Sequence, residues 1–195
     1  MTLFCLEQGA HLVLSIDFIK NYLKIDHSDD DELIANLTLT AQQLVENYAG
    51  VSFTRRRWKY ITTPSRGNIA RNADLKDKLF YAIPCNPVEE ICAIRLQKAQ
   101  QLQELTDYSV SCTETLTELA LDRKYLEKST KIICEFISGF SNIKEIPVFL
   151  RHAVLLTVSD LYQQRNQLQI SSSPHRLPPK VCSMLYGITA KNRLV

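Results

Sequence analysis

The turn near residue 27 and the acidic run after it hold side-chain types that perform acid–base or metal chemistry. Asp26, His27 and Ser28 are the residue types of a hydrolase triad. A triad is a spatial relay, which three neighbours in one turn cannot form. Residues 29–32 read Asp-Asp-Asp-Glu, but they lack the alternating ligands and bend glycine of a calcium loop. Negative charge complements a helix N-terminus, so we interpret the run as a helix start.

The strongest nucleic-acid signal is the run Arg55, Arg56 and Arg57, followed at once by Trp58. Clustered guanidinium groups bind phosphates, and an adjacent aromatic ring can stack on a base. Trp58 also belongs to an alternating stretch of strand formers, which favours a ring that packs inward. We therefore predict a phosphate-facing or partner-facing basic edge at residues 55–57. A small DNA-binding protein that uses this edge is the alternative function.

Signals for cofactors, metals and membranes are weak throughout the chain. Its six cysteines include no C-x-x-C pair and lie mostly among apolar neighbours, which is typical of reduced cytosolic thiols. There is no phosphate-binding glycine loop, no nucleophile elbow, no signal-peptide pattern and no bilayer-spanning stretch. We predict no catalytic residue, no cofactor, no metal and no membrane partner. A buried ionisable pair in a deep pocket would instead indicate an enzyme.

Length and composition suit one domain with a substantial core, since the chain has 195 residues and 45% of them are hydrophobic. The net charge is only +2, so no strongly charged partner is implied. The charge is unevenly placed, however, with a net −6 over residues 1–50 and +6 over residues 51–80. Such alternation can create head-to-tail complementarity between copies, and pairing within one chain is the simpler explanation.

Helical patterns at both ends of the chain and strand patterns in the middle predict an α+β fold. A long amphipathic helix is expected near 29–49, a central helix near 148–166, and a short C-terminal helix after Pro178. Short alternating stretches between them predict a β-rich insert. The predicted organisation is a single domain with five parts: an N-terminal arm (1–14), a helical part (15–50), the β-rich insert (51–140), a second helical part (147–187) and a C-terminal tail (188–195).

The long helix near 29–49 has an uncharged face opposite its apolar stripe. With Leu33 at 0° and about 100° per residue, the stripe centres near ~60° and Leu39 falls near ~240°. Interface cores are depleted in charge, so we predict that this face contacts a neighbouring subunit. The residues assigned to the contact are Ala35, Leu39, Gln42, Gln43 and Glu46.

Several short blocks follow one another over most of residues 15–186. They are Ile19–His27 running into Asp30–Ile34, Val45–Gly50 followed by Arg57-Trp58, Ile83–Val88, Ile137–Phe140, Ile146-Pro147, Leu161–Arg165, and Leu177-Pro178. Taken together and in this order, they resemble the phage head–tail connector family, also called head-completion or portal-adaptor proteins, which includes adaptors of gene transfer agents.

This resemblance implies a structural protein of the virion neck, made in the bacterial cytoplasm, and not an enzyme. About twelve copies are expected to form a ring under the portal protein, and the isolated chain is expected to be a monomer. The ring would extend the DNA channel without sequence-specific binding, and would offer a platform for a stopper or tail-proximal protein. The resemblance leaves open whether the parent particle is a phage, a prophage remnant or a gene transfer agent.

Overall fold

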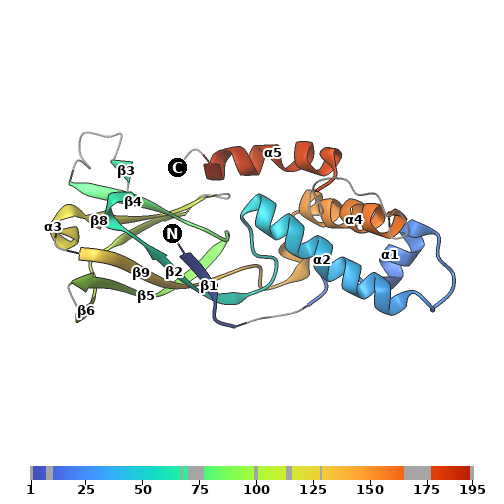
Figure 1. The fold of residues 1–195 in the computed structure, drawn as a ribbon, viewed down its shortest axis with the longest axis horizontal. Helices are drawn as coiled ribbons and strands as arrows, with labels where there is room; N and C mark the ends of the chain where they lie inside the picture. Colours follow the sequence, from blue (N-terminus) through green and yellow to red (C-terminus); the bar gives the residue numbers. More distant parts are fainter. Residues whose placement is uncertain are drawn as a thin grey trace.

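The protein is elongated, with its longer helices gathered at one end and its strands at the other (Figure 1). Helices and antiparallel sheets are both extensive, so the predicted α+β class is confirmed. The computed structural model describes residues 2–7, 11–66, 68–69, 77–98, 101–112, 116–127, 129–164 and 177–193. The predicted linker 167–176 lies outside these residues.

The β unit contains two antiparallel sheets, of five and four strands. The first has the order β1-β2-β9-β5-β6, with bounds Thr2–Cys5 (β1), Arg56–Thr62 (β2), Ser129–Ser138 (β9), Val88–Lys98 (β5) and Gln101–Glu104 (β6). The second has the order β3-β4-β8-β7, with bounds Asn68–Ile69 (β3), Lys78–Ile83 (β4), Thr117–Asp122 (β8) and Ser109–Cys112 (β7). Two short helical turns accompany the strands, Pro64–Arg66 (η1) and Arg123–Leu126 (α3).

Alternation along the strands creates the core of the β unit, because every second side chain of a strand points to the same face. In the register of β2 with β9, Trp58 lies opposite Phe136 and Tyr60 opposite Cys134. All four pack into this core. The inward position predicted for the Trp58 ring is therefore what the structure shows.

The helical unit has a separate core built from four helices. They are Ile16–Leu23 (α1), Asp31–Ala49 (α2), Val148–Gln163 (α4) and Pro179–Arg193 (α5). A short turn, Ile143–Glu145 (η3), precedes α4. Ser15 caps α1 by accepting the Phe18 N–H, and Gly50 ends α2 in the left-handed conformation. Branched and small side chains of α2 and α4, such as Ile34, Val45, Val154 and Val158, fill the space between them.

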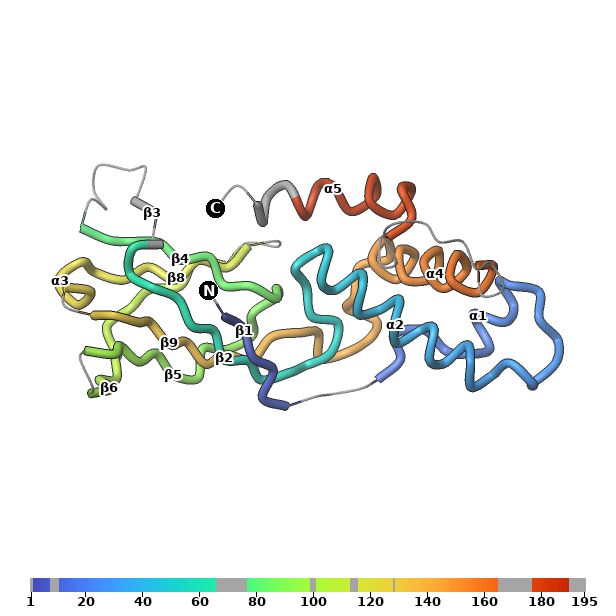
Figure 2. The backbone as a smooth tube through the Cα atoms, viewed as in Figure 1, coloured from blue at the N-terminus to red at the C-terminus, as the bar shows by residue number. Residues whose placement is uncertain are grey.

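Both ends of the chain differ from the sequence expectation. The predicted N-terminal arm (1–14), for which no strand was expected, contains β1, whose residue Leu3 lies opposite Tyr60 of β2. The C-terminal helix is fifteen residues long, so it is not short and continues through most of the predicted tail 188–195. Thr189 on this stretch is buried. In Figure 2, α5 runs back from the helical end toward the strands.

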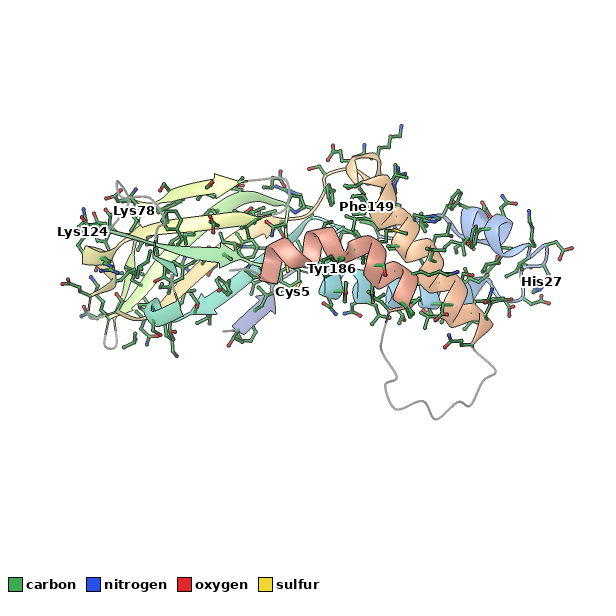
Figure 3. The ribbon with its side chains drawn as sticks, turned by 90° about the horizontal axis from the view of Figure 1, so that it is seen from above. Cys5, His27, Lys78, Lys124, Phe149 and Tyr186 are labelled. Atoms are coloured by element: carbon green, nitrogen blue, oxygen red, sulfur yellow. The ribbon has the colours of Figure 1, made fainter. Side chains whose placement is uncertain are left out.

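The central helix α4 is less completely enclosed than its composition suggested. Six of its residues are buried, but Val148 and Phe149 in the first turn are exposed. Figure 3 shows Phe149 at the start of α4 and Tyr186 on the surface of α5. A helix with apolar residues nearly all round was predicted to lie at the centre, and here its first turn reaches the surface.

Candidate assembly surfaces and the joint between the two units

The uncharged face predicted on α2 is only partly exposed. Leu39 is 39% exposed, Gln43 is exposed and Ala35 is half-buried. Gln42 and Glu46, in contrast, are buried at 2% and 6% exposure. These two residues belong to the interior of the subunit, and the structure corrects their assignment to an outer contact face.

Polar groups that are satisfied inside the protein explain this correction. The Gln42 side-chain carbonyl accepts the N–H of Val13 at 3.3 Å, and Thr38 donates its hydroxyl to the Ile34 carbonyl at 2.6 Å. The buried residues of α2 therefore centre near ~140° on the scale that places Leu33 at 0°, and not near ~60°. A pattern that counts only apolar residues misses a buried face containing paired polar groups.

The three arginines predicted as a basic edge each have an acidic partner within the subunit. Arg55 pairs with Glu89 at 2.7 Å on the surface. Arg56 pairs with Glu46 at 3.3 Å in the interior. The third pair is formed by Arg57, which donates to the Glu135 carboxylate at 3.1 Å. The three arginines are therefore paired locally, although Arg57 shares the Glu135 carboxylate with Arg95. This pairing weakens the positive potential that would attract a phosphate.

The Glu46 carboxylate lies where the helical unit meets the β unit. It accepts the Phe53 N–H at 2.7 Å and a bond from Arg56. Burial raises the pKa of this carboxyl, and the Phe53 N–H and Arg56 oppose that effect. Because these bonds tie α2 to Phe53 in the following segment and to Arg56 at the start of β2, we assign this buried ion pair a structural role.

Further backbone bonds fasten three crossings of the chain at this joint, which we define as residues 50–55, 84–87 and 139–140. Asn86 donates its N–H to the Gly50 carbonyl and accepts the Ser52 N–H, both at 2.9 Å. Gly139 donates to the Pro87 carbonyl at 2.9 Å and has a φ of +119°. A Cβ atom at Gly139 would lie 2.2 Å from the Thr54 carbonyl oxygen, so only glycine fits.

A second charged cluster lies on the outer face of the five-stranded sheet. The Glu135 carboxylate on β9 accepts bonds from Arg95 at 2.8 Å and Arg57 at 3.1 Å, so three neighbouring strands are connected. Partial burial by itself raises the pKa of Glu135, but the two arginines outweigh burial and hold it below its ordinary value. The arrangement strengthens the sheet and leaves no free acid or base for chemistry.

Triad-type residues Asp26, His27 and Ser28 are exposed in the turn between α1 and α2. Figure 3 places His27 at the tip of the helical end, far from the other labelled residues. Within the described part of the chain, no group of three or more His, Cys, Asp or Glu residues could hold a metal ion. Among the helices of that same part, none is long and apolar enough to cross a membrane.

Several exposed apolar side chains were not identified from the sequence. Phe4 and Leu6 lie on and just after β1, and Leu102 lies on β6. These strands are the two edges of the five-stranded sheet. The strand formers Leu3 and Phe4 were the available signal, but the stretch is too short for a periodicity argument.

Comparison with solved structures matches almost the whole chain. No protein-family model and no curated protein sequence matches it. A chain in the neck of an empty GTA particle, computed with C6 symmetry, has a TM-score of 0.67 at 15% identity, and the match covers 96% of this chain and 94% of that one. A chain of the virion of a native gene transfer agent (GTA) particle has a TM-score of 0.69 at 16% identity, covering 96% and 95%. A chain in the neck of a native GTA particle, computed with C12 symmetry, gives 0.63 at 15%, covering 96% and 94%.

The fold is shared. Each match covers 96% of this chain, so it extends over the helical unit, the joint and the β unit. The likeness therefore concerns the full architecture and not one motif. Such low identity establishes similarity of fold, and residue roles have to be argued from this chain itself.

Proposed function

We propose that the protein is a structural head–tail connector in the neck of a tailed phage or phage-like particle. About twelve copies form a ring under the portal protein, extend the DNA channel and provide the platform for tail attachment. The observation that carries this proposal is the end-to-end match of the fold to chains of GTA necks and virions. It is an assembly role, and it needs no active site.

Features of the surface support this function. Large apolar side chains are exposed as neighbouring pairs at two separate places, Phe4 with Leu6 and Val148 with Phe149, and also at Leu39 and Leu102. A protein that meets several neighbours at once needs several contact patches, and clustered exposed apolar residues mark such sites. The paired arginines at 55–57 favour this role over the alternative of a small DNA-binding protein.

The test is a reconstruction of particles from a producing strain, together with a strain that lacks this gene. We expect the wild-type chain as a ring of about twelve copies at the head–tail interface. The deletion strain should accumulate DNA-filled heads without tails, and a plasmid copy of the gene should restore the tails. A single copy per particle, or a position outside the neck, would contradict the proposal.

A further inference from the structure

The five-stranded sheet has an open edge at β1 that lacks the usual protection. Natural sheets blunt free edges with charged residues, proline or bulges. The segment Thr2–Leu6 reads Thr-Leu-Phe-Cys-Leu, with no charge and no proline, and it pairs with β2 without a bulge. Phe4 and Leu6 are each 48% exposed. Among the described residues, no strand pairs with the other side of β1.

Backbone groups of β1 are available for a further strand. In an antiparallel pair, successive residues direct their N–H and C=O alternately to the partner and away from it. Leu6 donates to the Arg57 carbonyl at 2.8 Å and so points toward β2. By alternation, the N–H and C=O groups of Leu3 and Cys5 point to the open edge.

The opposite edge of the same sheet, β6, likewise pairs with no further strand among the residues that the structure describes. Leu105 donates to the Ile94 carbonyl at 2.9 Å, so by alternation Leu102 and Glu104 direct their backbone groups outward. Leu102 is 59% exposed. It lies opposite Gln97, whose neighbour Leu96 is buried in the core, so Leu102 is on the outer face of the sheet.

Phe4 is on that same outer face. Its neighbour Leu3 packs toward the core of the β unit, and side chains alternate along a strand. Each edge of the sheet therefore presents a large exposed apolar side chain on the same side, Phe4 on β1 and Leu102 on β6.

We propose that β1 of one subunit pairs with β6 of the next, which joins the five-stranded sheets of neighbouring copies around the ring. This inference rests on the proposed ring and names its contact. The two edges are different surfaces of one sheet that face opposite ways, which is the arrangement of a head-to-tail interface. Because β1, β9 and β6 run in the same direction, the new pair is parallel, with Phe4 beside Leu102.

The second sheet ends in β7, which has no further partner strand in the described part of the chain, but its chemistry fits less well. Val110 lies opposite the buried Leu119 and so faces the core side. The outer side of β7 carries Ser109 and Ser111, which offer no apolar surface to Phe4. Leu102 on β6 does offer one, and it distinguishes the two edges.

A charge-rescue experiment in the producing strain tests the pairing. Phe4→Lys alone and Leu102→Glu alone should each reduce tailed particles by about tenfold or more, because the defect recurs at every contact in the ring. The two changes in one chain should restore assembly, since each lysine then meets the glutamate of the neighbouring copy. The matched control combines Phe4→Lys with Ser111→Glu, because Ser111 is exposed on the outer side of β7 as Leu102 is on β6, and it should remain defective. Rescue by this control, or normal assembly of both single variants, overturns the β1–β6 pairing.

A direct measurement keeps the test decisive if a variant folds poorly. In the neck of wild-type particles, β1 and β6 of adjacent copies should lie about 4.8 Å apart. A ring of this chain in which the two strands are separated overturns the pairing and leaves the proposed function intact. Absence of the wild-type chain from the neck overturns both.

Discussion

At the scale of single residues, Glu135 shows how charged groups of this protein are used within the subunit. Its carboxylate on β9 is held by Arg95 of β5 and Arg57 of β2. Because its folded pKa lies below the ordinary value of 4.5, the carboxylate stabilises the folded state above that pH. This contribution is lost as the pH falls through the lowered folded pKa.

Replacement of Glu135 by glutamine should therefore destabilise the protein by about 1 kcal/mol at neutral pH, since both arginines are partly exposed and screened. Denaturant unfolding at several pH values measures the difference. The gap between wild type and variant should close as the pH falls below about 4.5. A gap that stays constant down to acidic pH would show that Glu135 acts through packing and not through charge.

Partners of single residues were the least predictable feature of the sequence. The run 55–57 suggested one basic edge, yet its three side chains reach three different carboxylates. Two of these, Glu89 and Glu135, are 34 and 78 positions away from their arginines. Local sequence contains no information about such partners, because the sheet register brings them together.

At the scale of elements, the joint at residues 50–55, 84–87 and 139–140 holds the helical and β units together. Gly139 is the tightest point, because its conformation and the nearby Thr54 backbone both exclude a side chain. Gly187 is a useful contrast, since it lies within α5 and an added Cβ atom would meet nothing within 4 Å.

Gly139→Ala should lower the free energy of unfolding by about 3 kcal/mol or more, because the added methyl group requires the joint to move. Gly187→Ala should raise it by about 0.5–1 kcal/mol, because alanine favours the helical backbone. Thermal and urea unfolding of both variants provide the comparison. Equal effects of the two substitutions would contradict the tight fit at Gly139.

Hydrophobic periodicity in the sequence predicts that the main helices and strands exist and of which type each is, as the helix α2 and the strands β2 and β9 illustrate. The orientation of α2 did not follow, because Thr38, Gln42 and Glu46 are buried through hydrogen bonds that the apolar pattern ignores. The extension of α5 beyond residue 187 also escaped prediction, since its burial of Thr189 depends on tertiary packing.

At the scale of the whole molecule, Leu39 remains the central residue of the proposed contact face on α2, together with Gln43 and Ala35. Because Leu39 is 39% exposed, Leu39→Glu should change the unfolding free energy by no more than about 0.5 kcal/mol. We expect the variant to abolish ring assembly in particles. Fluorescence-monitored unfolding and neck reconstruction measure the two effects.

Leu33→Glu is the matched control, because Leu33 is similarly exposed on the same helix but lies about 120° away around it. Its assembly should be normal. If Leu39→Glu unfolds the protein, Leu39 belongs to the subunit core. If both variants assemble equally well, this face of α2 is ordinary solvent surface.

The tight packing of the joint bears on the number of subunits in the proposed ring. In a closed ring of twelve copies, each copy is turned by about 30° from its neighbour, and in a ring of thirteen by about 28°. The two proposed contacts, at Leu39 on the helical unit and at β1 on the β unit, lie on opposite sides of the joint. An angular error of a few degrees at Gly139 would therefore repeat in every copy and accumulate around the circle. We expect a joint that admits not even one methyl group to keep that error small, so that the stereochemistry of a single glycine would help to fix the number of subunits in the proposed ring.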